Sequence, residues 1–138
     1  TVTLKVLECL RADFGGGSCP DRETAETIGR LFRDYGYLCD PHTAVAVKVL
    51  ADYRVASGDR RKTIVASTAS PYKFTADVLE AITANAVPED DFAQVQMLSE
   101  LSGTTPPASL LALKGKPVRF TGSVARDEMV SAVLAMLG

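Results

Sequence analysis

The sequence predicts an α/β fold in which helices pack on one or a few parallel strands. Most of the 138 residues fall into stretches with apolar side chains at helical spacing, bounded by capping residues, glycine or proline. Between two such stretches lies Thr63–Ala66, a β-branched and apolar run that ends in the hydroxyl-rich segment 67–70 and is followed by Pro71. A buried parallel strand delivers polar side chains to a ligand at its C-terminal edge in this way.

Capping signals set the bounds of the first two predicted helices. Thr3 caps a helix that ends near Asp13. The run Gly15-Gly16-Gly17 then forms a loop, because consecutive glycines do not continue a helix cheaply. Asp21 caps the second helix, which Gly36 terminates. The apolar stripe of the second helix consists of Ala25, Ile28, Leu31, Phe32 and Tyr35.

Asp40 followed by Pro41 is a strong start for a third helix. Aspartate accepts hydrogen bonds from the free backbone N–H groups, and proline fits the first helical position. Residues 44–50 are apolar on nearly all sides, so we expect a buried helix packed closely on a sheet that fades at Ser57.

The second half of the chain adds helices and at most one more strand. Helical patterns are expected at residues 74–82, 88–98, 109–114 and 126–137, with a loop at 103–107 and a short strand at 118–120. A complete α/β domain of this size would show four or five strands, and a lone strand cannot bury itself. We therefore expect the rest of the sheet to lie in another part of a longer chain. The alternative is a mostly helical domain with a strand pair at its edge.

Composition and charge exclude several classes of function. Hydrophobic residues make up 46% of the sequence, charged residues make up 23%, and the formal net charge is −2. The basic run Arg60-Arg61-Lys62 is too short for a nucleic-acid-binding face. No apolar run approaches the roughly 20 residues of a membrane span, and no signal peptide opens the chain. We therefore expect neither a nucleic acid nor a membrane as partner.

The cysteines indicate reduced thiols rather than a disulfide framework. Cys9, Cys19 and Cys39 are odd in number and no pair has CxxC spacing. With His42 as the single histidine, a zinc site is not expected, so the predicted metal content is none. The simplest interpretation is a cytoplasmic protein.

Two segments have both a structural and a functional interpretation. In the structural interpretation, capping alone explains Asp40, and a single histidine such as His42 is more often a structural hydrogen-bonder than a catalyst. The same helix start also offers free N–H groups and a partial positive charge to an anion. In the second segment the hydroxyls can simply mark a strand-to-helix loop, with Ser70 as a cap and Pro71 at the first helical position; the functional interpretation instead has the Thr68 hydroxyl meet a ligand.

Several segments, in this order and spacing, resemble the C-terminal part of threonine synthase from bacteria and fungi. The matching segments are Phe14–Ser18, Asp21–Thr24 with Ile28, Tyr35–Tyr37, Asp40–Ala46 and Ser67–Phe74. Residues 14–74 form the best-matching core, and residues 75–138 match only as a variable helical tail. The Ser-Phe-Lys-Asp-like motif that carries the Schiff-base lysine of the family is absent from the sequence. The resemblance thus implies that residues 1–138 are a C-terminal portion of a larger catalytic domain.

The resemblance implies a pyridoxal 5'-phosphate (PLP) enzyme of the tryptophan-synthase-β type, fold-type II. Such an enzyme converts O-phospho-L-homoserine and water to L-threonine and phosphate in threonine biosynthesis. Thr68 aligns with the hydroxyl expected at the pyridine nitrogen of PLP, where a neutral partner leaves the ring less protonated than aspartate would. His42 and Thr43 align with the helix start that faces the active-site cleft, and Lys73 matches the family motif. Family members often carry histidine where this chain has Ser70.

Further expectations concern the isolated chain. No catalytic residue is expected in it, and we predict no turnover and no bound PLP without the missing N-terminal part of the same chain. Apolar surface should be exposed where the rest of the sheet belongs, which favours self-association. Two other functions stay open. One is another fold-type II enzyme, such as a threonine dehydratase or a β-replacing synthase; the other is a non-catalytic helical domain that binds a partner or a small anion.

Overall fold

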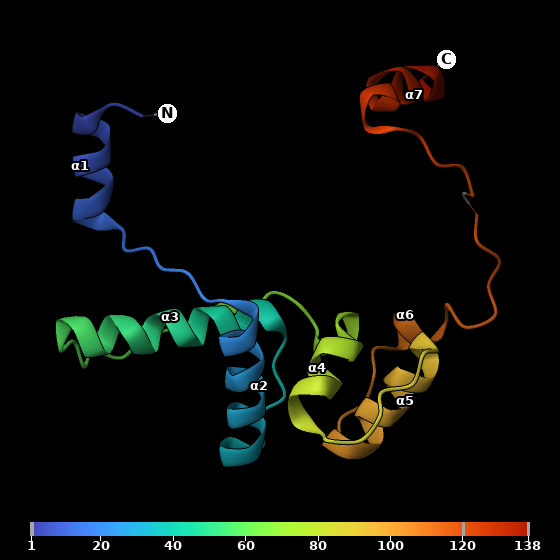
Figure 1. The fold of residues 1–138 in the computed structure, drawn as a ribbon, viewed down its shortest axis with the longest axis horizontal. Helices are drawn as coiled ribbons and strands as arrows, with labels where there is room; N and C mark the ends of the chain where they lie inside the picture. Colours follow the sequence, from blue (N-terminus) through green and yellow to red (C-terminus); the bar gives the residue numbers. More distant parts are fainter. Residues whose placement is uncertain (1, 120, 138) are drawn as a thin grey trace.

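A computed structural model describes residues 2–119 and 121–137 as a set of helices (Figure 1). In chain order these are α1 (Leu4–Asp13), α2 (Asp21–Tyr35), α3 (Pro41–Ser57), the 3-10 turn η1 (Pro71–Lys73), α4 (Thr75–Ile82), α5 (Asp91–Ser102), α6 (Ala108–Leu111), the 3-10 turn η2 (Arg126–Glu128) and α7 (Met129–Met136). Helices α2 to α6 form one body, and α1 and α7 stand away from it at the ends of extended connections (Figure 1). No helix in this part of the chain is long and apolar enough to cross a membrane.

The predicted α/β fold on parallel strands is wrong: residues 2–119 and 121–137 contain no strand. Thr63–Ala66 is irregular, and Ile64 is 97% exposed. A strand needs a neighbour to pair its backbone groups and to cover its apolar side chains, and the described chain offers none. Val118 and Arg119 likewise form no strand, and Phe120 lies outside the described residues.

The expectation of a buried α3 packed on a sheet is also wrong. Within α3 only Thr43 and Ala44 are buried, and Val55 is exposed. The helix packs against α2 on one side. On another side the irregular segment 59–67 runs back along it, since Arg54 near the end of α3 donates to the Arg61 carbonyl at 3.0 Å. An all-round apolar helix therefore keeps much of its surface uncovered.

The helix ends follow the local signals closely. Thr3 caps α1 by accepting from the Val6 N–H, and α1 ends at Asp13 as expected. Gly36 ends α2 in the left-handed conformation at φ 63°. One prediction needs a small correction: Asp21 is the first residue of α2, and Pro20 holds the cap position. The expected helix at 109–114 is the shorter α6, and the expected helix at 126–137 is divided into η2 and α7.

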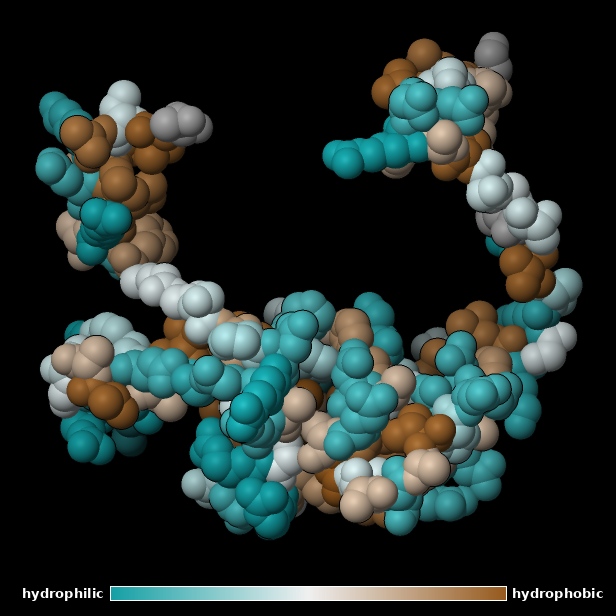
Figure 2. Space-filling view, in the orientation of Figure 1, coloured by the Kyte–Doolittle hydropathy of each residue, from teal (hydrophilic) through white to brown (hydrophobic). Residues whose placement is uncertain are grey.

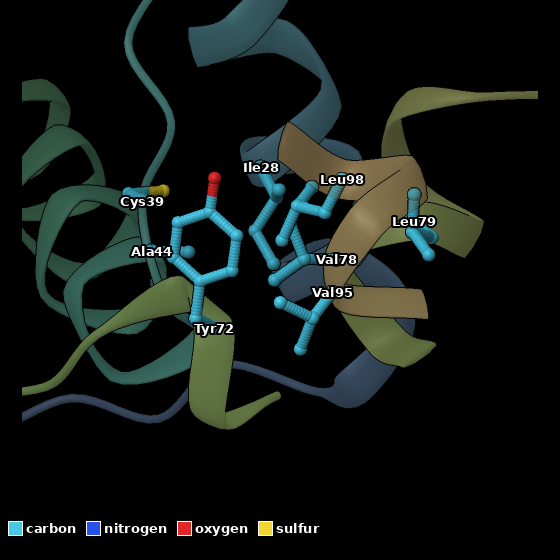
Figure 3. Packing of buried hydrophobic residues seen from close by; sticks show 8 residues of the cluster. All are labelled: Ile28, Cys39, Ala44, Tyr72, Val78, Leu79, Val95 and Leu98. Carbon is cyan, nitrogen blue, oxygen red and sulfur yellow. The ribbon is translucent and has the colours of Figure 1, made fainter. Parts of the chain in front are cut away.

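A small apolar core joins α2, α4 and α5 to η1 and the start of α3. Its buried members are Ile28, Cys39, Ala44, Tyr72, Val78, Leu79, Val95 and Leu98 (Figure 3). Tyr72 comes from η1 and Ala44 from α3, and both belong to this one cluster (Figure 3). The core thus fixes the start of α3 and η1 relative to each other; these two elements carry His42, Thr43 and Lys73, and Thr68 lies in the irregular segment just before η1.

Candidate functional site

The candidate site is built around the buried carboxylate of Asp40 at the start of α3. Its side chain is 0% exposed and accepts from the backbone N–H groups of His42 at 2.9 Å and Thr43 at 3.3 Å. It also accepts from the Thr43 hydroxyl, and His42 Nδ1 lies 3.2 Å from the same carboxylate. A carboxylate only accepts, so His42 presents a protonated Nδ1 to Asp40.

These contacts keep Asp40 ionised although it is buried. Burial opposes the charge, but the hydrogen bonds from Thr43 and His42 outweigh burial and hold the pKa of the Asp40 carboxyl below its ordinary value. A buried carboxylate with several donors is a fixed negative point next to the helix N-terminus, where the helix dipole favours it.

The hydroxyl of Thr43 links this carboxylate to a distant part of the chain. Thr43 is 3% exposed, and its Oγ1 lies 2.9 Å from the Ser67 hydroxyl, 24 residues along the sequence. Thr43 carries a single hydroxyl proton and Asp40 can only accept. That proton therefore goes to Asp40, and the Ser67 hydroxyl donates to Thr43.

The hydroxyl-rich segment after Ser67 leads into η1. Thr68 is exposed and makes no hydrogen bond with the described part of the chain. Ser70 caps η1 by accepting from the Tyr72 N–H at 3.3 Å, which confirms its capping interpretation. The buried Tyr72 places its hydroxyl 3.0 Å from the Thr104 carbonyl oxygen.

The remaining predicted residues lie on the exposed side of this cluster. The His42 side chain is 68% exposed, and its ring packs against Phe74 at a centroid distance of 5.1 Å. Lys73 is exposed at the end of η1. The structure therefore brings His42, Thr43 and the segment 67–74 together. Among residues 2–119 and 121–137, it shows no hydrogen bond or ion pair between Thr68 or Lys73 and the other predicted residues.

Sequence reasoning missed two members of the cluster. Asp40 was expected only as a cap, and Ser67 was expected only as part of a polar loop. The position of Thr43 three residues after the cap is a signal for the first, because a side chain there reaches back to the cap. No local signal identifies Ser67, because its partner is remote in sequence.

The nearby cavities do not include the predicted cofactor residue. A cavity of about 510 Å³ is lined by Pro41 together with acidic side chains, among them Asp77 and Glu80. A second cavity of about 660 Å³ lies between the loop 15–18 and α3. Thr68 lines neither of them. Within the described residues, no group of at least three histidine, cysteine, aspartate or glutamate side chains is placed to hold a metal ion.

Comparison with known proteins places the chain in a family. Residues 43–133 match the family described as "Threonine synthase, C-terminal". This match covers more than half of the chain, which therefore belongs to the threonine synthase family, and the resemblance noted from its motifs is confirmed.

Individual relatives agree with this assignment. The chain is 34% identical over 101 residues to "Threonine synthase-like 1" of Macaca fascicularis, covering 73% of this chain and 13% of that protein. It is 41% identical over 66 residues to threonine synthase of Haemophilus influenzae, covering 48% of this chain and 15% of the enzyme. The Schizosaccharomyces pombe threonine synthase is 36% identical over 75 residues. The chain thus spans roughly one seventh of these relatives' lengths. No solved structure matches.

Proposed function

We propose that this chain forms one wall of the active site of a PLP-dependent threonine synthase. The enzyme would convert O-phospho-L-homoserine and water to L-threonine and phosphate. The observation that carries the proposal is the exposed residue Thr68, whose hydroxyl makes no hydrogen bond with the described chain, beside a cluster that joins the two family motifs Asp40–Ala46 and Ser67–Phe74. Membership of the family supplies the reaction class.

Thr68 fits the role of partner to the cofactor ring. Its hydroxyl is neutral, exposed and uncommitted to the described chain, so it is available to a pyridine nitrogen. PLP would supply the electron sink for the reaction, and a hydroxyl partner would keep the ring nitrogen less protonated than a carboxylate would. In this proposal the chain itself contributes no covalent attachment to the cofactor.

His42 and Lys73 would face the substrate side of the same wall. The substrate carries a phosphate and a carboxylate, and the Lys73 ammonium is an exposed cation that can attract either. The contact with Asp40 fixes the proton of His42 on Nδ1, which leaves Nε2 free to accept a hydrogen bond. Thr43 would stand beneath these side chains as a buried link.

The proposal makes residues 1–138 a C-terminal portion of the catalytic domain, with core 14–74 and helical tail 75–138. The partner of this portion is the upstream part of the same enzyme, which would supply the attachment lysine and the phosphate-binding loop. We call the two parts together the complete enzyme. We further propose a cytoplasmic location, which the free thiols of Cys9, Cys19 and Cys39 support.

Two measurements test the proposal. The 138-residue chain with added PLP and O-phospho-L-homoserine should release no phosphate, whereas the complete enzyme should. The upstream part can be taken from the Haemophilus influenzae enzyme. In the complete enzyme, Thr68→Val should shift the pH titration of the bound cofactor's absorption, with Thr63→Val, an exposed threonine of the same segment, as control. Turnover by the chain alone, or an unchanged titration in Thr68→Val, would contradict the proposal.

A further inference from the structure

Thr68 lies between two points at which its segment is fixed to the helical body. On one side is the Ser67 hydroxyl on Thr43. On the other side, Ser70 caps η1 and the buried Tyr72 holds η1 in the core. Only Thr68 and Ala69 lie between these points, so little conformational freedom is left to Thr68.

The first of these points, the contact between Ser67 and Thr43, is isolated within a long irregular stretch of the described chain. From Ile64 to Ala69, the Ser67 contact to Thr43 is the one hydrogen bond that the described part of the chain provides. No strand ladder supports this stretch, because no strand is present in residues 2–119 and 121–137. On the N-terminal side of Thr68, its position therefore depends on this single side-chain contact.

That contact is itself held by a buried charge. Thr43 is 3% exposed and Asp40 is 0% exposed, so water does not compete well for the hydroxyl that joins them. A hydrogen bond to an ionised carboxylate is about twice as strong as one between neutral groups. Asp40 thereby fixes the orientation of the Thr43 hydroxyl. The Thr43 oxygen then accepts the hydrogen bond from the Ser67 hydroxyl along one fixed direction.

We propose that Ser67 is a positioning residue that sets the Thr68 hydroxyl at the ring nitrogen of PLP. Asp40 and Thr43 act through Ser67 and touch neither cofactor nor substrate. This inference rests on the proposed function of Thr68. It assigns the connection between the two family motifs a role in tuning the cofactor, beyond holding the fold together.

The first test follows the order of Thr68 in the 138-residue chain. The backbone order parameter of Thr68, measured by ¹⁵N relaxation, should fall from about 0.85 to below about 0.6 in Ser67→Ala. Ser67→Thr keeps the hydroxyl and should restore the wild-type value. Thr63→Val removes another hydroxyl of the same segment and should leave Thr68 unchanged, since Thr63 contacts Arg54 and Arg61 instead.

The second test follows the cofactor in the complete enzyme. Loss of one positioning hydrogen bond should weaken PLP binding about three- to tenfold in Ser67→Ala. It should also shift the pH titration of the bound cofactor's absorption in the same direction as Thr68→Val. Thr43→Val should reproduce both changes and Thr43→Ser should not. If the Ser67 contact only stabilised the fold, Ser67→Ala would lower the free energy of unfolding without shifting the pH titration of the cofactor's absorption.

The outcomes separate the two proposals. An unchanged order parameter in Ser67→Ala overturns the positioning role and leaves the function of Thr68 intact. The role is also overturned if the order parameter falls while Thr68→Val alone changes the cofactor titration. If Thr68→Val changes nothing, the proposed function fails and the positioning role fails with it.

Discussion

At the scale of single residues, Asp40 combines a role visible in the sequence with one that is not. Its capping of α3 follows from the Asp-Pro pair, because capping depends on neighbours in sequence. Its burial depends on the core around it, whereas its bond to the Thr43 hydroxyl has a local signal, because Thr43 stands three residues after the cap. The contact between Thr43 and Ser67 joins residues 24 apart and could not be predicted from either motif alone.

Replacing Asp40 should destabilise the fold in a pH-dependent way. Asp40→Ala removes a buried cap and should lower the free energy of unfolding by about 1 to 3 kcal/mol at pH 7. The folded pKa of Asp40 lies below its ordinary 3.8, so its contribution is full above that pH. The contribution is lost as the pH falls through the lower folded value. Urea unfolding followed by circular dichroism at pH 7 and below pH 4 measures both effects.

Asp90 provides a matched control for Asp40. It caps α5 by accepting from the Ala93 N–H at 2.8 Å, but it is exposed. Asp90→Ala should therefore cost about 1 kcal/mol or less. An equal cost for Asp40→Ala and Asp90→Ala would show that burial of Asp40 adds nothing.

The cysteines should differ sharply in reactivity. Cys39 is 1% exposed, and burial, with the nearby charge of Asp40, raises the pKa of its thiol to about 11. The thiolate is the reactive form, so Cys39 should resist a disulfide reagent at pH 8 until the chain unfolds. Cys9 is exposed on α1 and should react at once. Reaction of Cys39 in the folded Cys9→Ser variant at the rate of Cys9 in the wild type would contradict this.

At the scale of elements, the helices could be predicted from the sequence, whereas the strands predicted from it do not form in residues 2–119 and 121–137. Helix periodicity and caps are local, and the first three helices lie close to their expected ranges. A strand depends on partners elsewhere in the chain, so a β-branched run such as Thr63–Ala66 does not specify a sheet by itself. Burial likewise depends on partners elsewhere in the chain, and this explains why α3 is less buried than its composition suggests.

Close contact between α2 and α4 gives a sharp test of packing. A Cβ added to the buried Gly29 would lie 2.5 Å from the carbonyl oxygen of Ala81. Gly29→Ala should therefore destabilise the fold by about 1 to 2 kcal/mol, although alanine favours helix by about 1 kcal/mol. Thermal or urea unfolding measures the difference.

The control for this variant introduces alanine elsewhere in α2. Arg33 is exposed in the last turn of the helix, and Arg33→Ala should change stability by no more than about 0.5 kcal/mol. A Gly29→Ala variant as stable as the wild type would mean that α2 and α4 separate without cost.

At the scale of the whole molecule, much apolar surface is uncovered. No residue of α1 or α7 is buried, and brown side chains gather on both helices in Figure 2. The large exposed residues of α7 are Met129, Val130, Val133, Leu134 and Met136. Large exposed apolar patches of this kind are typical of interaction sites and of surfaces prone to association.

We expect the isolated chain to self-associate through these helices. Light scattering after gel filtration should show a mean mass that rises with concentration, because association buries apolar area. Val130→Lys together with Leu134→Lys should reduce the effect, whereas Val55→Lys, at a single exposed position on α3, should not. A constant monomer mass at high concentration would contradict the prediction.

The irregular segment that returns along α3 makes the chain open to limited proteolysis. Arg60, Arg61 and Lys62 are consecutive trypsin sites in an exposed stretch without regular structure. Cleavage there would leave two pieces, one with Thr43 and one with Ser67, each still seated in the shared core through Ala44 and Tyr72. A nicked chain would then migrate as one species under native conditions and as two in detergent. The two halves of the motif pair could thus be exchanged between separately prepared peptides.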